Sequence, residues 1–468
     1  MKEKTNRKLS TGEAILLLVV SVAILMWGVL KAGTPTAMSL MISGAICALY
    51  GYAVLRQKWD DMFDHTMKIV SGAMPALYFL MFTGAVSAAW IASGTIPYII
   101  YVGLGIIKPQ IFLFAALLIT ALTSFCTGSS WAIIASVGLA LSGIGQGLGV
   151  PPALTAGCVV SGCFMGDKWS PLSDSCNLVA ATSGQKSIDV SKSMIATTGL
   201  SLVISLVLYL IIGFKYNNGA DISEITNYIS QLGASFNMSI LTLLPLVFVI
   251  VMVVLKFPIL PVLFGGVLIG VLEAMFFQGQ TLPEVITACW SGYVCDSGYE
   301  FVDSLFNRGG IIGTAELIML FFSAVFFAGS AEAIGIIDVI VQLLTKVIRG
   351  AGSLVAATVA TCIGIVFLTS SDYTSIILNN RLYEETYKKL GLDGIVLSRA
   401  VAESTTTIGA ICPWNSSAMV AAAAVGVSAF AYAPYSFPTW IAIILAVVFA
   451  FIGKFTPRIQ PEATQETR

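Results

Sequence analysis

The chain has 468 residues, of which 57% are hydrophobic and only 10% are Asp, Glu, Lys or Arg. A soluble globular protein carries roughly 25% charged residues, so this chain could not cover a surface that faces water and must be solvated by lipid. Its net charge of -1 gives no electrostatic footprint for nucleic acid. The nine cysteines are scattered and His65 is the single histidine, which argues against a zinc or iron–sulfur site. We expect no bound cofactor.

The two ends of the chain predict its orientation in the membrane. Four of the first eight residues are basic, and the apolar run over 14–30 that follows is longer than the core of a cleaved signal peptide. A bilayer helix needs about 20 residues, so we expect this run to be the first transmembrane helix. The positive-inside rule places the N-terminus in the cytoplasm, and Lys454 and Arg458 place the C-terminus there too. The sequence therefore predicts a multi-pass protein of the bacterial inner membrane.

Long apolar runs follow one another along the whole chain. Backbone polar groups must be satisfied within lipid, so spanning elements are helices or closed barrels, and runs of this length exclude the alternating pattern of a barrel. We expect an all-α polytopic fold with about 11–13 helical elements, some of them broken. Residues 59–68 are predicted to form an interfacial amphipathic segment without a functional role, and residues 216–237 an external loop.

A sequence pattern occurs twice in the chain. Three landmarks recur at nearly one offset, 246, 245 and 242 residues: Thr123 at Thr369, Gly84 at Gly329 and Pro171 at Pro413. The alternative is that Ser, Thr and Gly clusters are simply common in membrane helices. The repeat predicts five regions: N-terminal helices with the interfacial segment (1–70), a first repeat with a hairpin and a broken helix (71–215), an external loop with connecting scaffold helices (216–311), a second such repeat (312–455) and a cytoplasmic tail (456–468).

Charge placement indicates that the two copies are inverted. The stretch 109–166 holds no charged residue, and its arms, 110–122 and 131–145, are too short to span comfortably. They predict a re-entrant hairpin with a Ser/Thr/Gly tip at an external mouth. The matching hairpin around 369–375 has basic flanks, which belong in the cytoplasm: Lys346, Arg349, Arg381, Lys388 and Lys389. One hairpin would then enter from each side, with the site at the midplane.

The stretch "GDKWSPLSDSCN" (166–177) sets three charges between apolar runs. A charge at the bilayer centre costs on the order of 3 kcal/mol, so the stretch must line a cavity, pair internally or lie outside the membrane. Pro171 breaks the helix and frees backbone groups on both sides. Carbonyl oxygens with Asp167 or Asp174 suit Na⁺, whereas free amides and serine hydroxyls suit a carboxylate. The alternative is a surface loop in which Asp167 and Lys168 form a solvated pair.

The second copy offers a comparable set. Asp372 lies in its hairpin tip, and a polar run leads from Arg399 and Glu403 to Asn415. Arg399 is left open between a carboxylate clamp and a helix-end base that reaches for water. We expect Glu403 to face a cavity, and we leave Glu332 open between a proton relay and a structural pair.

The motif "GDKWSPLSD", the serine-rich hairpin and "ESTTTIGAICPWNSSA" resemble the NhaC family of bacterial Na⁺/H⁺ antiporters over most of the chain. Within that family the sequence is similar to the malate–lactate antiporter branch. The resemblance implies the ion-transporter superfamily fold, with a fixed scaffold and a moving unit that carries two hairpins. It also implies malate uptake with protons against release of lactate with Na⁺. Plain Na⁺(Li⁺)/H⁺ antiport stays the alternative, because no short motif separates the two. The matching motif positions are Asp167, Ser170, Pro171, Ser173, Asp174 and Asn177.

These observations predict secondary active antiport by alternating access. Asp167 or Asp174 would bind either Na⁺ or a proton, and this competition couples the two ions. The predicted cation and proton sites, with Asp167 and Asp174 as the Na⁺ ligands, are Asp167, Ser170, Ser173, Asp174, Asn177, Asp372 and Glu403. The predicted contacts of the carboxylate substrate are Ser124, Thr127, Ser129, Ser370, Ser371, Thr374, Arg399, Thr406 and Asn415.

The expected partners are Na⁺, protons, malate, lactate and membrane lipid, with a second copy of the chain as an open alternative and no nucleic acid. We expect no enzymatic activity. Two rival hypotheses are an intramembrane protease that uses Asp167 and Asp372 as acid and base, and a channel. The internal repeat has no role in the protease hypothesis, and counterflow-stimulated transport distinguishes a carrier from a pore.

Overall fold

The computed structural model describes residues 7–216, 222–345 and 348–459, and every regular element in this part of the chain is a helix. Eight of the described helices are long and apolar enough to cross a membrane, or up to ten spans if each bent pair counts as one. The predicted all-α polytopic fold is therefore confirmed. Lys2, Lys4 and Lys346, which contributed to the predicted orientation, lie outside the described residues.

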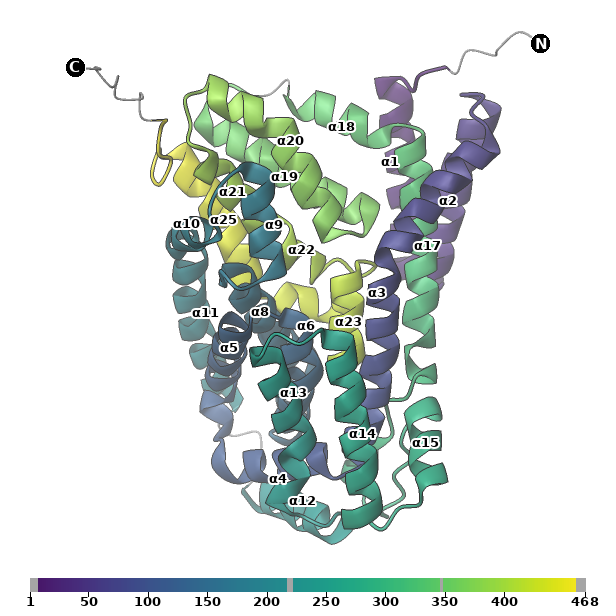
Figure 1. Ribbon diagram of the computed structural model, residues 1–468, viewed down its shortest axis with the longest axis vertical. Helices are drawn as coiled ribbons and strands as arrows, with labels where there is room; N and C mark the ends of the chain where they lie inside the picture. Colours follow the sequence, from purple (N-terminus) through teal and green to yellow (C-terminus); the bar gives the residue numbers. More distant parts are fainter. Residues whose placement is uncertain (1–6, 217–221, 346–347, 460–468) are drawn as a thin grey trace.

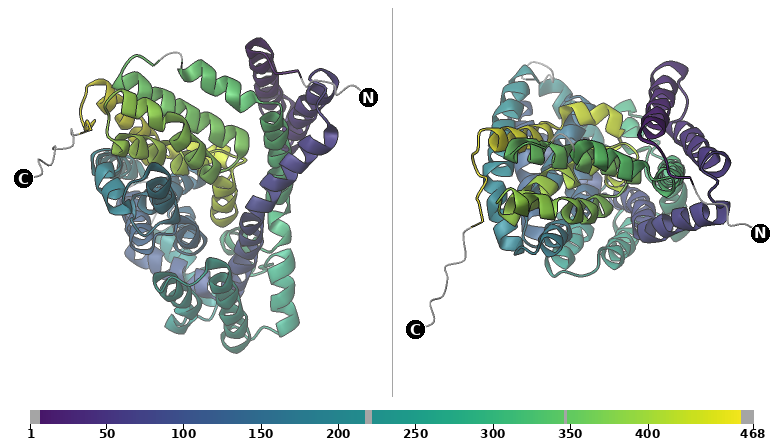
Figure 2. Two further views of the ribbon diagram at one scale, coloured as in Figure 1. Left: turned by 45° about the horizontal axis from the view of Figure 1, so that its top comes forward. Right: turned by 90° about the horizontal axis from the view of Figure 1, so that it is seen from above.

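The N-terminal helices α1 (Thr11–Trp27) and α2 (Thr36–Ala53) form a pair at one side of the molecule, where α2 packs against α17 (Ala315–Ala333) (Figures 1 and 2). The next helix, α3 (Trp59–Ala92), has 34 residues. Residues 59–68, predicted to form an interfacial amphipathic segment, are the first turns of α3. Pro75 lies inside α3 without ending it. Helix α3 packs against α14 (Ile259–Phe277) and α17.

The internal repeat has one constant offset. The helices α5 (Pro109–Thr127) and α19 (Ala351–Thr369) have 19 residues each and begin 242 positions apart. The same offset relates α8 (Pro152–Trp169) to α21 (Gly394–Ser404), and α9 (Asp174–Ser183) to α23 (Ser416–Val425). Of the three predicted landmarks, only the pair of prolines has this offset. The other two were out of register by three or four residues, because a Ser/Thr/Gly-rich sequence aligns almost equally well with its neighbours.

Both hairpins turn in the same way. Gly128 and Ser370, again 242 positions apart, have left-handed backbones with φ of 68° and 55°. The next residue, Ser129 or Ser371, caps the second arm by accepting the backbone N–H three residues further on. These second arms are the segment 130–147, made of α6 (Ser130–Ile133), η2 (Ile134–Gly138) and α7 (Leu139–Gly147), and the helix α20 (Asp372–Lys389).

The arms of the first hairpin are longer than the sequence predicts. They have 19 and 18 residues, and each is long enough to cross a membrane. In Figure 1 the arms of the two hairpins extend toward opposite ends of the molecule, with α20 near α18 (Ile336–Thr345) and the first hairpin toward α4 (Thr95–Ile106). This arrangement agrees with the predicted inversion of the two copies.

Shorter and connecting helices complete the described fold. They are α10 (Ser187–Ser193), α11 (Thr198–Gly213), α12 (Ile222–Ser235), α13 (Leu244–Val254), α15 (Leu282–Ser291), α16 (Glu300–Phe306), α22 (Thr406–Gly409), α24 (Ala429–Tyr432) and α25 (Phe437–Phe451), with single turns η1 (Gly28–Ala32), η3 (Met194–Ala196), η4 (Phe214–Tyr216), η5 (Ile240–Leu243), η6 (Ile312–Thr314) and η7 (Ala433–Tyr435). The predicted external loop at 216–237 contains the helix α12, and residues 217–221 lie outside the described part.

Glycines allow α8 to approach α5 closely. A Cβ atom at Gly162 would lie 2.1 Å from Oγ1 of Thr120, and one at Gly166 would lie 2.2 Å from the carbonyl oxygen of Ala121. Small residues at such positions let backbones meet where the hydrophobic effect gives no force between helices in lipid. This close contact fixes the helix that carries Asp167 against the first hairpin.

We predict that Gly166→Ala destabilises the protein, because the added methyl group meets a backbone carbonyl that cannot rotate away. Overpacking of this kind costs about 1–3 kcal/mol. The matched control is Gly105→Ala on α4, where no heavy atom lies within 4 Å of the added Cβ, so stability should stay equal or rise slightly. Thermal unfolding of both variants in detergent measures the difference. Equal unfolding temperatures for the two variants would contradict the packing described.

Candidate functional site

Two helix breaks face one another across the repeat. The chain leaves α8 at Trp169 and enters α9 at Asp174, so the predicted break at Pro171 is confirmed. The second break lies between α22 and α23 and contains Pro413. Ser173 and Asn415, at equivalent repeat positions, cap the helices that follow by accepting the N–H two residues on. Side-chain caps thus satisfy backbone donors that lipid could not.

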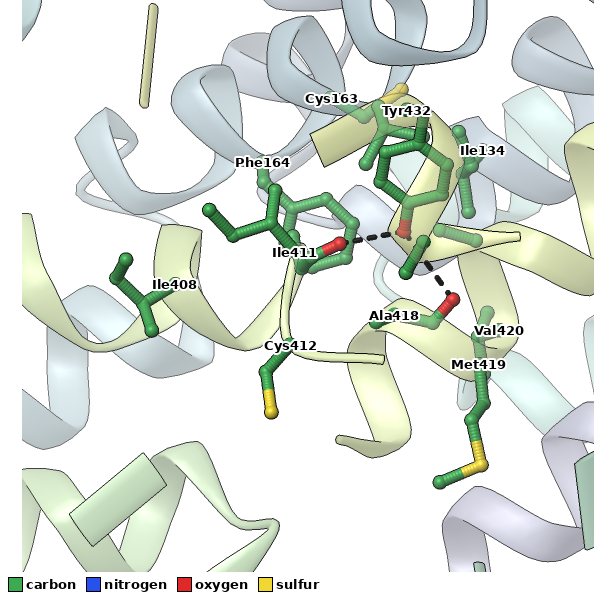
Figure 3. Packing of buried hydrophobic residues seen from close by; sticks show 14 of the residues in the cluster. Ile134, Cys163, Phe164, Ile408, Ile411, Cys412, Ala418, Met419, Val420 and Tyr432 are labelled. Carbon is green, nitrogen blue, oxygen red and sulfur yellow. Dashed lines mark hydrogen bonds between the residues drawn. The ribbon is translucent and has the colours of Figure 1, made fainter. Parts of the chain in front are cut away.

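A buried tyrosine supports the second break. The hydroxyl of Tyr432 donates to the carbonyl oxygen of Ala410 at 2.6 Å and lies 3.4 Å from that of Ala418, so it joins the two sides of the break (Figure 3). The ring packs among buried apolar side chains that include Ile134 and Cys163 (Figure 3). This packing holds the break rigidly, as a binding site requires.

The breaks and both hairpin tips line one cavity of about 680 Å³. Oxygen-bearing side chains dominate its polar lining, and they come from both repeats. The cavity also reaches α3 and α17. Its polar lining residues are His65, Lys68, Ser129, Ser130, Asp167, Ser173, Asp174, Ser175, Glu332, Thr369, Ser370, Ser371, Asp372, Tyr373, Thr374, Thr406, Ser416 and Ser417. The structure therefore brings together the stretch 166–177 and the two serine-rich tips, and the alternative of a surface loop is wrong.

Asp167 has one oxygen free to bind a ligand. Its side chain is 7% exposed, and its Oδ2 accepts a hydrogen bond of 2.7 Å from the hydroxyl of Ser130. Its Oδ1 has no partner among the described residues, and the same holds for the shielded hydroxyls of Ser370 and Thr406, which line the same cavity. Carboxylate and hydroxyl oxygens are the ligands that hard cations prefer. The cavity therefore presents unpartnered oxygen atoms from both repeats, of the kind that suits Na⁺.

Asp372 is held in a different way. Its Oδ1 accepts from Nδ2 of Asn415 at 2.9 Å, and its Oδ2 accepts from the hydroxyl of Ser417 at 2.8 Å. Gly409 makes room for it, since a Cβ there would lie 1.9 Å from Oδ1 of Asp372. Asp174, in contrast, is exposed at the cavity surface. The three aspartates thus differ in how accessible their carboxylate oxygens are. Both oxygens of Asp372 accept hydrogen bonds, Asp167 has one oxygen without a partner among the described residues, and Asp174 is exposed.

Lys168 and Glu403 form a buried ion pair away from the cavity lining, with side chains 1% and 0% exposed. Glu403 also accepts hydrogen bonds from the hydroxyls of Thr197 and Thr198. The expectation that Glu403 faces a cavity is wrong, because its carboxylate is committed to this pair. Lys168 likewise turns away from Asp167 and does not form the surface pair considered as an alternative.

Two other predicted contacts in the first hairpin serve its structure. The hydroxyl of Ser124 donates to the carbonyl oxygen of Cys163 at 2.6 Å and joins α5 to α8. The hydroxyl of Thr127 donates to the carbonyl oxygen of Thr123 in its own helix. Neither residue lines the cavity, because both still belong to α5, and it is the end of the predicted tip, Gly128 to Ser130, that reaches the lining.

Four more predicted residues lie outside the cavity lining, and one of them, Asn415, holds Asp372 and caps α23. Ser170 uses its hydroxyl to accept the N–H of Leu172 within the break, and Asn177 accepts from the hydroxyl of Ser187. Arg399 donates to the carbonyl oxygen of Phe455, near the end of the described chain, so the structure does not place it as a carboxylate clamp.

The sequence did not identify the wall formed by α3 and α17. His65 and Lys68 of α3 line the cavity, and Nε2 of His65 lies 3.4 Å from Oε2 of Glu332 on α17. The spacing of three residues, which places both side chains on one helix face, was the available signal. A face turned toward a polar cavity has the same pattern as one turned toward bulk water, so the sequence alone favoured an interfacial segment.

Comparison with known proteins identifies the family of the chain. The model of the Na⁺/H⁺ antiporter family matches residues 162–454, which include both helix breaks and the second hairpin. The chain belongs to the Na⁺/H⁺ antiporter family. The predicted resemblance is thereby confirmed, and the protein is a multi-span membrane transporter of the antiporter type.

Three relatives match almost the whole chain. The malate-2H(+)/Na(+)-lactate antiporter of Bacillus subtilis is 33% identical over 444 residues, which are 95% of each chain. The Na(+)/H(+) antiporter NhaC of Alkalihalophilus pseudofirmus is 32% identical and covers 96% of this chain and 97% of its own. The arginine/ornithine antiporter ArcD of Halobacterium salinarum is also 32% identical, over 98% and 96%. Similar chains therefore carry different named substrates.

We predict that Glu403→Gln destabilises the protein by about 3–5 kcal/mol, because it leaves the Lys168 charge buried without its partner. The double variant Lys168→Met/Glu403→Leu removes both charges and should recover most of the stability. Thermal unfolding in detergent compares the three proteins. If the double variant were less stable than Glu403→Gln, the pair would contribute to stability by more than the mutual compensation of two buried charges.

Proposed function

We propose that this antiporter couples Na⁺ and H⁺ to the exchange of small carboxylates, with malate uptake against lactate and Na⁺ release, by alternating access. The observation that carries the proposal is a cavity of about 680 Å³ that joins three aspartates to hydroxyl groups of both hairpin tips. Small-molecule sites occupy about 300–1,000 Å³, so the cavity is large enough for an organic ligand as well as a cation. The malate–lactate relative supports the same substrate class.

The charge of the cavity supports obligatory coupling. An anion placed beside Asp167, Asp174 and Asp372 would be repelled unless cations neutralise them. Na⁺ and protons compete for the carboxylate oxygens, so a carboxylate can occupy the cavity only together with one or the other. Free hydroxyls such as those of Ser370 and Thr406 can donate to the anion or coordinate the cation.

Plain Na⁺/H⁺ antiport is the second candidate. It is favoured by the acidic polar lining, in which Lys68 and His65 face three aspartates and Glu332, and by the NhaC relatives. Competition between Na⁺ and a proton at Asp167 would suffice for this activity without an organic substrate. For either candidate function we propose that both termini lie in the cytoplasm, because basic residues lie near each end of the chain.

We predict that Asp167→Asn and Asp174→Asn each reduce Na⁺-dependent proton flux in proteoliposomes to less than about a tenth of the wild-type rate, which corresponds to a loss of about 1.4 kcal/mol or more. An amide keeps the shape of the side chain but binds neither a proton nor Na⁺ with the strength of a carboxylate. The matched control is Asp61→Asn, an exposed position at the start of α3 that does not line the cavity. Full coupled exchange in both cavity variants would remove this site from consideration.

A counterflow measurement separates the two candidate functions. Uptake of labelled malate is measured into vesicles preloaded with lactate and Na⁺, or with Na⁺ alone, across an imposed proton gradient. We expect lactate to accelerate malate uptake, because the return of a loaded carrier replaces the return of an empty one. Indifference to both acids, with intact Na⁺/H⁺ exchange, would instead assign plain antiport.

A further inference from the structure

Arg308 lies in the connection between α16 and η6, at the contact between α3 and α23. The two glycines that follow it fix this connection on α3. A Cβ at Gly309 would lie 2.8 Å from the backbone nitrogen of Ala88, and the N–H of Gly310 donates to the carbonyl oxygen of Gly84 at 2.8 Å. On the other side, a Cβ at Gly426, the cap of α23, would lie 3.4 Å from Nη1 of Arg308. The guanidinium group is therefore held between the two helices.

The guanidinium group of Arg308 has no partner that balances its charge. Its Nε and Nη2 are shielded from solvent and donate to none of the described residues. Burial alone lowers its pKa to about 10, with no contribution from any described carboxylate, so the group remains protonated at neutral pH. The C-terminus of α23 contributes a partial negative charge of about one half, which does not compensate a full positive charge.

The two unpartnered nitrogens form a recognisable binding edge. Nε and Nη2 lie on the same side of a guanidinium group and donate in parallel, which matches the two oxygens of a carboxylate. Arg308 as a whole is half-buried, so it is this edge of the guanidinium group that is shielded from water. Leaving shielded donors without a partner costs about 1–3 kcal/mol each. A ligand that accepts from both nitrogens would remove this cost.

Arg308 and the cavity lie at opposite ends of the α3–α23 contact. Helix α23 begins at Ser416 in the cavity lining and ends at Gly426, and ten residues of helix span about 15 Å. Helix α3 contributes Ala76 to the cavity and Ala88 to the Arg308 connection, about 18 Å apart by the same measure. The packed faces of α3 and α23 lie between these two ends and close the path from Arg308 to the aspartates.

We propose that Arg308 is the carboxylate-capture site on the side of the α3–α23 contact opposite the cavity. When α23 separates from α3 in the alternate state, the Nε–Nη2 edge becomes accessible and binds a mono- or dicarboxylate, which then passes along α23 to the aspartates. The inference rests on the proposed carboxylate exchange, because a cation-only antiporter has no anion for this site to bind.

The test compares the wild-type protein with Arg308→Gln and Arg308→Lys in proteoliposomes, with labelled malate and lactate as probes. We expect the KM for malate to rise about 10–100-fold in Arg308→Gln, since a charge-assisted pair contributes about 1.5–3 kcal/mol. We expect a rise in Arg308→Lys as well, because an ammonium group lacks the forked donor. At saturating malate and lactate the maximal rate of coupled exchange should stay at the wild-type value in both. Arg381→Gln, an exposed arginine on α20, is the matched control.

Thermal unfolding gives a second readout that a structural role would not produce. Replacing a half-buried guanidinium group whose shielded donors have no partner should leave the unfolding temperature equal or higher, as in Arg308→Met, whereas loss of a structural contact would lower it. A wild-type KM for malate in Arg308→Gln would overturn the capture site and leave the proposed function intact. A loss of transport that persists at saturating malate would also overturn it, as a structural effect. Wild-type protein that carries Na⁺ and protons but no carboxylate would overturn both proposals.

Discussion

A carboxylate buried among lipid-solvated helices must find its hydrogen-bond donors inside the protein, because each unmet polar group costs about 1–3 kcal/mol. The two repeats meet this constraint with the carboxylate on different elements. In the first, Asp167 on the broken helix accepts from Ser130 at the hairpin tip. Asp372 stands 242 positions after Ser130, and Gly409 stands 242 positions after Asp167. The second copy therefore carries its carboxylate on the hairpin and a glycine on the broken helix.

Because the carboxylate and the glycine occupy opposite elements in the two repeats, the two carboxylates differ in their hydrogen bonds although the repeats share one fold. Asp372 is bonded through both oxygens by Asn415 and Ser417, and Gly409 leaves space for it. Asp167 keeps Oδ1 without a partner among the described residues. A fully bonded carboxylate contributes a fixed field to the cavity, whereas one with an open oxygen can exchange ligands. A symmetric fold thus acquires an asymmetric site, which a transporter that moves unlike ions requires.

Local chemistry predicted the fold class, the breaks at Pro171 and Pro413 and the need to shield the charges near them. Long-range partners were not predictable in this way. Lys168 and Glu403 are separated by 235 residues, and helices that are apolar on every side carry no periodicity that would indicate which faces meet. The cavity face of α3 was misread for a related reason, because a helix presents polar side chains to an internal cavity and to bulk water alike. The arms of the first hairpin were underestimated because polar residues up to Thr127, which lower the hydropathy, still belong to the helix, and the serine and glycine at the tip cap it locally.

The charges at the two ends of the α3–α23 contact imply an order of events for an anionic substrate. At Arg308 a carboxylate meets an uncompensated positive charge and needs no companion. In the proposed exchange the same carboxylate meets three aspartates and Glu332 in the cavity, against Lys68 and His65 of the same lining. Na⁺ or protons that neutralise the excess of acidic groups favour its arrival there. Under this proposal cation binding precedes the anion, and the charges of the cavity couple the two.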